Sequence, residues 1–160
     1  MIRKSKNKEM KTAVFPGTFH PFTIGHQSIV ERGLKIFDRI IIAIGYNEHK
    51  SATSDVDARL KDISALYRDD DRVVVASYSG LTVDFVRKCG ADCILRGVRG
   101  VMDFEYERNL ADVNRRLSGV ETILLFTLPE HGFVSGSMVR ELAHNGVDVS
   151  EYLAVKSRED

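Results

Sequence analysis

A run of glycine, threonine and histidine residues near the N-terminus has the composition of a phosphate-binding loop. Residues 16–26 read PGTFHPFTIGH, between an apolar segment and residues with helical spacing. Glycines let the backbone approach a ligand closely, and the free N–H groups at a helix start attract anions. His26 falls in the first helical turn, where an imidazole can donate to a phosphoryl oxygen. The alternative is a turn whose histidines only cap and pack. The pairing of Gly17-Thr18 with Gly25-His26 favours phosphate chemistry.

Basic residues follow two later apolar runs. Lys50 ends the polar stretch 47–50, and Arg96 and Arg99 flank a glycine in the sequence RGVRG. Guanidinium groups match phosphate oxygens in geometry, and a lysine supplies a point charge. Each of these residues has a plainer interpretation as a solvated surface charge. Their position after buried strands makes them candidate phosphate ligands.

Two further segments have structural and functional interpretations. Asp103 and Glu105 open a predicted helix, and we interpret them as an acidic first turn that complements the helix dipole. Ser135, Gly136 and Ser137 precede another helix, where a serine can cap the helix, donate to phosphate, or do both.

Short unbroken apolar runs predict the strands that position these residues. The runs are 13–15, 40–44, 73–76, 93–95 and 123–126, and they are typical of parallel strands covered on both faces. Segments with helical spacing lie around them, at 29–37, 56–67, 82–88, 106–117 and 137–145. In the fourth, Tyr106, Leu110, Val113 and Leu117 form the apolar face, and Gly119 can end the helix. The alternation predicts an α/β fold, a Rossmann-like doubly wound sheet of five parallel strands.

The organisation along the chain predicts one domain. Residues 12–160 carry the α/β pattern, and residues 1–11 are basic with little apolar content. We expect this first segment to be a disordered basic tail or a segment added for expression. In doubly wound sheets ligands bind at the carboxyl ends of the strands, so the loops that carry the polar residues gather there.

Composition excludes several classes of function. The 160 residues include 23 basic and 23 acidic side chains, so no overall field favours a nucleic acid or an anionic membrane. The longest apolar run, 40–44, is far shorter than the roughly 20 residues that span a bilayer. Cys89 and Cys93 lack a second pair at metal-ligand spacing, which favours a reduced structural pair. We expect a cytoplasmic protein.

The first loop resembles the signature of the nucleotidyltransferase superfamily, because Thr23-Ile24-Gly25-His26 matches its (H/T)-x-G-H motif. The dinucleotide fingerprint and the P-loop lysine pattern are both absent. With RGVRG, the following DFEYE and the terminal S-x-S-x-V-[KR]-E element, the chain from about residue 13 to about residue 152 resembles the bacterial phosphopantetheine adenylyltransferase family. Three features depart from that family: His20 replaces its usual aspartate, Gly136 replaces the middle of three serines, and residues 47–52 around Lys50 lack its usual prolines and second lysine.

The resemblance implies a role for each matching position. Thr18 is expected to contact both phosphates, Lys50 to hold the attacking phosphate with Thr18 and Arg96, and His26 to stabilise the transition state; Thr18, Lys50 and His26 are the expected catalytic residues. Positions for phosphopantetheine are Thr18, Lys50, Thr82 and Arg96. Positions for ATP are Thr18, Phe19, His26, Gly97, Val98, Arg99, Glu107, His131, Gly132, Phe133, Val134, Ser135, Gly136 and Ser137.

The implied reaction joins ATP and 4′-phosphopantetheine into dephospho-coenzyme A and pyrophosphate by in-line attack. The attacking phosphate is already an anion, so neither a general base nor a covalent intermediate is required. Magnesium is expected to arrive with ATP, because the sequence shows no dedicated carboxylate cage. The family implies a homohexamer and feedback by coenzyme A. The alternatives are a nicotinate mononucleotide adenylyltransferase, a polyol-phosphate cytidylyltransferase, and a non-catalytic nucleotide sensor.

Overall fold

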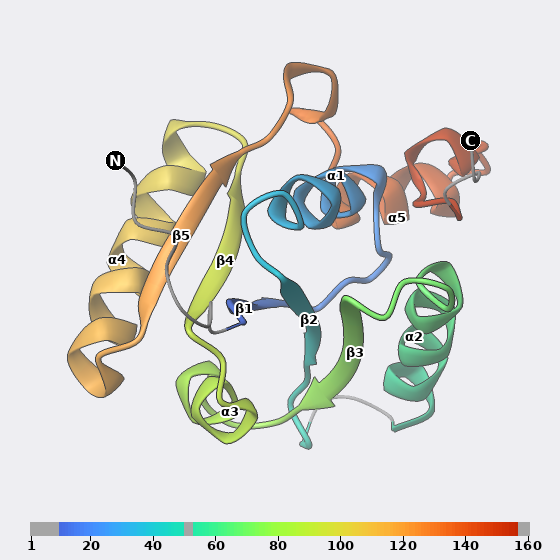
Figure 1. The fold of residues 1–160 in the computed structure, drawn as a ribbon. Helices are drawn as coiled ribbons and strands as arrows, with labels where there is room; N and C mark the ends of the chain where they lie inside the picture. The colour runs from blue at the N-terminus through green and yellow to red at the C-terminus, as the bar shows by residue number, and fades with distance from the viewer. Residues whose placement is uncertain (1–9, 50–52, 157–160) are drawn as a thin grey trace, which may run out of the picture.

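The computed structural model describes residues 10–49 and 53–156, in which strands and helices alternate (Figure 1). The strands are β1 (Thr12–Gly17), β2 (Arg39–Gly45), β3 (Val73–Tyr78), β4 (Cys93–Val98) and β5 (Glu121–Phe126). The helices are α1 (Ile24–Gly33), α2 (Thr53–Leu66), α3 (Thr82–Cys89), α4 (Val101–Ser118) and α5 (Gly136–His144), with short 3-10 helices at Pro129–His131 and Ser150–Tyr152. All strand pairs are parallel, in the order β3-β2-β1-β4-β5. The predicted fold is confirmed.

The core lies on both faces of the central strands. On one face Ile29 and Val30 of α1 and Val56 and Ile63 of α2 pack with residues of β1, β2 and β4. On the other face Val83 and Val86 of α3 pack against Val14, Ile41 and Ile94. Because β1 and β2 are buried on both sides, their apolar runs show no alternation, as the sequence analysis predicted.

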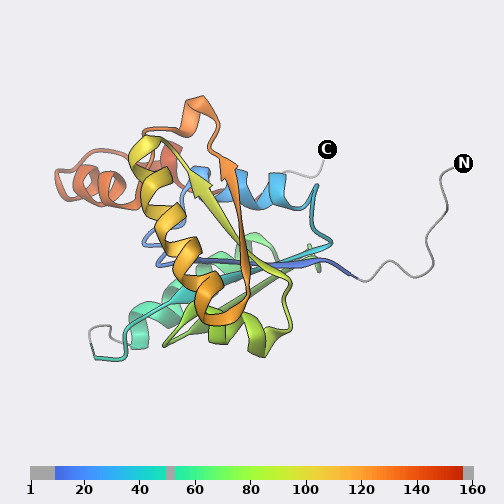
Figure 2. The ribbon, with the colours of Figure 1, turned by 90° about the vertical axis from the view of Figure 1, so that its left-hand side faces the viewer.

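The outer part of the sheet is less covered than predicted. Figure 2 shows α4 running beside β5, where Ile123 and Phe126 remain exposed. The predicted helix over 106–117 is confirmed, but its apolar face is not buried within this chain. Tyr106, Val113 and Leu117 are more than half exposed, and Glu107 is the buried residue of α4. The helical periodicity is real, and Gly119 ends the helix in a left-handed conformation at φ 74°. The apolar face, however, points away from this core.

Three predictions concern the chain outside the site. The predicted tail lies largely outside the described residues, although Lys11 donates its backbone N–H to Asp38 and pairs with Asp92 at 3.5 Å. Cys89 and Cys93 are free thiols, the first exposed and the second buried. Within the described part of the chain, no helix is long and apolar enough to cross a membrane.

Candidate active site

The site lies where β1 and β4 separate. These strands are in register at Ala13–Cys93 and Val14–Ile94, whereas β1 stays paired with β2 as far as Gly17. Pro16 has no backbone N–H to donate to a neighbouring strand. Instead, Nη1 of Arg96 donates to the carbonyl oxygen of Pro16 at 2.5 Å. The strand order reverses between β1 and β4, which is the position where doubly wound sheets bind ligands.

His26 is held in a defined orientation at the start of α1. The Thr23 hydroxyl accepts from the His26 backbone N–H, and the Thr23 backbone N–H donates to Nδ1 of His26 at 3.0 Å. Nδ1 is therefore an acceptor, so in the neutral ring the proton sits on Nε2. Burial, with the nearby charges of Arg96 and Arg99, lowers the pKa of His26 to about 4. At neutral pH His26 is an uncharged donor through Nε2–H.

Phe19 shapes the loop between β1 and α1. Its backbone lies at a positive φ of 47°, and its ring is buried against Phe15, Phe22 and His26 at centroid distances of 5.2, 5.2 and 5.0 Å. A Cβ added at Gly17 would lie 2.8 Å from this ring, so the turn requires glycine there. Phe19 thus packs beside the imidazole of His26 in addition to lining the pocket described below.

Arg96 forms a closed ion pair with Glu107. Its Nε and Nη2 donate to the two carboxylate oxygens at 2.9 and 2.6 Å, and Glu107 is buried. A buried carboxylate without a cation would be costly, so each residue stabilises the charge of the other. The sequence analysis placed these residues on different substrates. The structure joins them into one ion-paired group.

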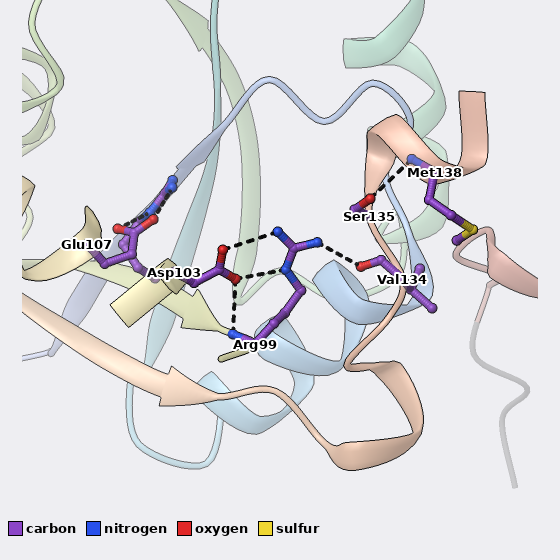
Figure 3. Close-up of polar contacts among 7 residues, drawn as sticks. Arg99, Asp103, Glu107, Val134, Ser135 and Met138 are labelled. Carbon is purple, nitrogen blue, oxygen red and sulfur yellow. Dashed lines mark hydrogen bonds and ion pairs between the residues drawn. The ribbon is translucent and has the colours of Figure 1, made fainter. Parts of the chain in front are cut away.

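Arg99 is held in a similar way by Asp103, as Figure 3 shows. The Asp103 carboxylate accepts from Nε of Arg99 at 2.9 Å and from its backbone N–H at 3.2 Å, and this bonding lowers the Asp103 pKa. Nη1 of Arg99 also contacts the Val134 carbonyl oxygen at 3.4 Å. The interpretation of Asp103 as a plain dipole-complementing residue was incomplete, because its carboxylate orients a pocket arginine.

The start of α5 forms another wall. The Ser135 hydroxyl accepts from the Met138 backbone N–H at 3.1 Å, so Ser135 caps the helix (Figure 3). A Cβ added at Gly136 would lie 2.9 Å from the carbonyl oxygen of His20. Two of the features that depart from the family pattern are therefore neighbours. Glycine at 136 allows α5 to approach the first loop closely.

Two adjoining pockets open at this edge of the sheet, and they share Pro16, Gly17, Thr18, Arg96, Tyr106 and Glu107. The first, which we call the acceptor pocket, has a volume of about 450 Å³ and extends between the β2 and β3 loops and α4. The second, the donor pocket, has a volume of about 390 Å³ and lies between the first loop, Arg99 and α5. The junction at Thr18 and Arg96 is the place where groups bound in the two pockets would meet.

Most predicted site residues reach these pockets. Thr82 lines the acceptor pocket, while Thr18, Arg96 and Glu107 line both. Those lining the donor pocket are Phe19, His26, Gly97, Arg99, Glu107, Val134, Ser135, Gly136 and Ser137. Four predicted residues do not line either pocket: Val98, His131, Gly132 and Phe133. Of these, Val98 is buried. Lys50 lies outside the described residues.

The sequence analysis did not select three polar residues of the site. Tyr78 lines the acceptor pocket and shares a hydrogen bond of 2.8 Å with the Thr82 hydroxyl. Arg59 of α2 donates to the carbonyl oxygen of Thr18, and Arg140 of α5 lines the donor pocket. Arg140 belongs to the terminal motif already quoted, so its basic character was the available signal. Nothing local marks Arg59 or Tyr78.

Metal ligands are not clustered in the part of the chain that the structure describes. No group of three or more His, Cys, Asp or Glu side chains there could hold a metal ion. The two carboxylates of the donor pocket, Asp103 and Glu107, are engaged by Arg99 and Arg96. The described residues do not form a resident metal centre.

The low pKa of His26 gives a prediction about stability. As pH falls from 7 to 5, the unfolded chain protonates this histidine near its usual pKa of 6.5, whereas the folded chain does not. Binding of this proton lowers the free energy of the unfolded state only, so the free energy of unfolding of the wild-type protein decreases. We expect His26→Gln to lose about 2 kcal/mol less over this range, since 1.5 pH units below the usual value correspond to about that energy. Urea unfolding at both pH values measures the difference.

Glutamine is the matched replacement because it can occupy the same place in a Thr-x-x-Gln capping box. The two proteins should show equal changes between pH 8 and pH 7, where neither state of wild type titrates His26 appreciably. Parallel stability curves down to pH 5 would contradict the lowered pKa.

Comparison with known proteins identifies relatives of the whole chain. The profile of the cytidylyltransferase-like family matches residues 14–142. The chain is 51% identical over 144 residues to a phosphopantetheine adenylyltransferase of Bacteroides thetaiotaomicron, covering 90% of this chain and 95% of that protein. It is 45% identical over 139 residues to the enzyme of that name from Leuconostoc citreum, covering 87% and 88%.

Among solved structures, the fold is similar to a bifunctional NMN adenylyltransferase/ADP ribose pyrophosphatase from Francisella tularensis. The TM-score is 0.67 at 18% identity, with 93% of this chain aligned to 46% of that chain. This likeness shows the fold, and the chain spans less than half of that larger protein. The sequence relatives, in contrast, match nearly end to end. The chain belongs to the phosphopantetheine adenylyltransferase family of cytidylyltransferase-like proteins.

Proposed function

We propose that the protein transfers the adenylyl group of ATP to 4′-phosphopantetheine, giving dephospho-coenzyme A and pyrophosphate in coenzyme A synthesis. The observation that carries this function is the pair of pockets joined at Thr18 and Arg96. A two-substrate transfer needs both reacting groups side by side, and here one wall is common to both pockets. ATP occupies the donor pocket, and the phosphate end of 4′-phosphopantetheine reaches the junction from the acceptor pocket.

The chemical step is an in-line displacement at the α-phosphorus. An oxygen of the acceptor phosphate forms the new P–O bond, and the bond to the β-phosphate oxygen breaks, releasing pyrophosphate. The attacking oxygen is already ionised at neutral pH, so the protein supplies positioning and charge stabilisation. Thr18 and Arg96 hold the attacking phosphate at the junction, and we assign Lys50 to the same task.

His26 stabilises the charge that grows on the α-phosphoryl oxygens. Its Nε2–H is directed by the hydrogen bond at Nδ1, and the N-terminal end of α1 adds its positive dipole. A neutral donor suits this role, because it needs no proton transfer and remains in one protonation state at physiological pH.

Magnesium enters as part of the substrate. Since no metal-binding group of side chains lies within residues 10–49 and 53–156, we propose that the ion is carried by the ATP phosphates rather than by a resident site. Coenzyme A, which carries the same pantetheine arm as the product, is the feedback ligand we propose for the joined pockets. The free thiols Cys89 and Cys93 support a cytoplasmic location.

The decisive assay combines purified protein, ATP and 4′-phosphopantetheine and follows pyrophosphate release. A nucleotide sensor would bind ATP and release no pyrophosphate. A nicotinate mononucleotide adenylyltransferase or a polyol-phosphate cytidylyltransferase would require its own acceptor or donor. Formation of dephospho-coenzyme A in equal amount to pyrophosphate establishes the reaction.

The exposed apolar surface of α4 and β5 supports a homo-oligomer, which we propose to be a hexamer. Met102 is 81% exposed and Phe126 73%, and Val113, Leu117 and Ile123 continue the surface. Several large apolar side chains exposed on two neighbouring elements are typical of a protein–protein interface rather than of a solvated surface. A second copy of the chain is the partner we propose.

We therefore expect Val113→Glu and Leu117→Glu to shift the protein to smaller species in light scattering coupled to size-exclusion chromatography, because each buries a charge in the interface. Ile36→Glu is the matched control, since Ile36 is also apolar, is 56% exposed and lies in the segment between α1 and β2 rather than on α4 or β5. A wild-type protein that already runs as a monomer, or variants with unchanged mass, would contradict this interface.

A further inference from the structure

A short segment late in the chain, residues 153–155, lies beside the loop that leads into α1. Thr23 forms an isolated antiparallel bridge with Leu153. The Ala154 backbone N–H donates to the Phe22 carbonyl oxygen at 3.3 Å. The end of the first loop is therefore held by backbone contacts to a segment far from it in the sequence.

Gln27 joins α1 itself to the same segment. Its side-chain amide donates to the Val155 carbonyl oxygen at 2.7 Å and accepts from the Val155 backbone N–H at 3.1 Å. Gln27 is buried, and a buried amide without partners is costly, so the pairing with Val155 accounts for a glutamine on this face of α1. The Gln27 backbone N–H also donates to the Thr23 carbonyl oxygen at 3.0 Å, which closes the first helical turn.

We propose that Gln27 is a positioning residue, which holds the first turn of α1 against the segment 153–155 and thereby fixes the direction of Nε2 of His26. This inference rests on the proposed function, because it assigns His26 to the adenylyl transfer. Thr23 provides the connection, since it bridges to Leu153 and its backbone N–H donates to Nδ1 of His26 at 3.0 Å. A displacement of Thr23 would turn the imidazole.

Gln27 does not contact the space where the substrates would meet. Neither Gln27 nor any residue of the segment 153–155 lines the acceptor pocket or the donor pocket. An effect on the reaction must therefore pass through a residue that does, and His26 is its neighbour in α1. Because Val155 is 62% exposed, water can bond its backbone when the amide is removed. We therefore expect the chain to fold without these two bonds.

Gln27→Met tests this role, because methionine has nearly the same length and can form neither bond. We expect kcat to fall about 10-fold, since small displacements of a positioned group strongly affect the chemical step, while the KM values for ATP and 4′-phosphopantetheine change by less than about 2-fold. In a His26→Ala background the same substitution should change kcat by less than about 2-fold, because the group that Gln27 positions is absent.

Val73→Ala is the matched control for a loss of stability alone. Val73 is buried at the amino end of β3, whereas the carboxyl end of this strand, at Tyr78, lines the acceptor pocket. Urea unfolding measures the stability of both variants. The control should keep the wild-type kcat even where its loss of stability equals that of Gln27→Met.

A spectroscopic measurement reports the same role without turnover. The nitrogen-15 chemical shifts of the His26 ring at pH 7 should show a single tautomer in the wild-type protein, protonated at Nε2. In Gln27→Met we expect a mixture of tautomers, because the Thr23 N–H no longer holds Nδ1 in place.

The outcomes distinguish this inference from the proposed function. An equal fall in kcat with and without His26 would show that Gln27 does not act through the imidazole. An unchanged kcat, or an unchanged tautomer in Gln27→Met, would show that its amide only anchors the segment 153–155. Each of these results overturns the inference. A wild-type protein that forms no dephospho-coenzyme A but shows the expected tautomers would instead refute the proposed function and leave the positioning of His26 supported.

Discussion

Pyrophosphate release from ATP with 4′-phosphopantetheine should have a kcat/KM at least about 10³-fold above that with nicotinate mononucleotide or glycerol 3-phosphate, the scale seen when the polar groups of a site are left unpaired. The acceptor pocket explains the preference. It extends from the junction along Gly80 and Thr82 and is bounded by Leu110 and Asn114 of α4. A long arm with amides and methylene groups can fill this space. Glycerol 3-phosphate would leave it empty.

Nicotinate mononucleotide fails for a different reason. Its ribose and charged ring need hydrogen-bonding and charged partners, whereas beyond the phosphate end the pocket is lined by uncharged residues such as Gly80, Leu110 and Asn114. Steady-state rates with the three acceptors at one ATP concentration give the ratio. Equal turnover of all three acceptors, or none with 4′-phosphopantetheine, would overturn the acceptor assignment even if the residues around ATP behave as proposed.

The Arg96–Glu107 pair determines which variant can test the phosphate end of this pocket. Arg96→Ala would leave the buried Glu107 carboxylate without its cation, at a cost of about 3–5 kcal/mol in stability. Arg96→Lys keeps a positive charge for Glu107 and loses the forked geometry. It should raise the KM for 4′-phosphopantetheine more than the KM for ATP, whose other contacts remain.

The sequence predicted the parts of this site that depend on local pattern. Strand β2 could be predicted because a short unbroken apolar run between two segments with helical spacing is typical of a buried strand. His26 could be predicted because it lies at a helix start, where its side chain is held in a defined orientation. The strands, the helices and the first loop were all predicted from short stretches of sequence. Such local patterns carry no information about contacts between residues that are distant in the chain.

Arg96 and Pro16 are 80 residues apart, and Arg140 and His20 are 120 apart. No spacing rule connects such residues, so neither bond was predictable. Asp103 shows the same limit at short range: its place in a first helical turn was correct, yet its role came from the direction of the Arg99 side chain. The apolar face of α4 was predicted by periodicity, but periodicity does not say whether that face meets this core or another chain.

Replacing His26 with alanine should lower kcat by about 10²-fold or more and leave ATP affinity nearly unchanged, because losing one positioned donor at a developing oxyanion has that effect. The structure explains why kcat should fall while the affinity for ATP is retained. His26 has no charge to attract ground-state ATP, since its pKa is about 4, and its Nδ1 is used by Thr23. Only Nε2–H remains for the substrate, and its contribution grows as charge develops on the α-phosphoryl oxygens.

Single-turnover measurements with saturating ATP and 4′-phosphopantetheine separate the chemical step from product release in this variant, and calorimetry with ATP reports binding. Alanine also removes one bond of the α1 capping box, which would disturb ATP binding if the loop shifted. Intact ATP affinity with a slow chemical step therefore identifies transition-state stabilisation. A wild-type kcat in His26→Ala would remove His26 from the reaction, and a parallel fall in ATP affinity and kcat would assign it to holding the loop instead.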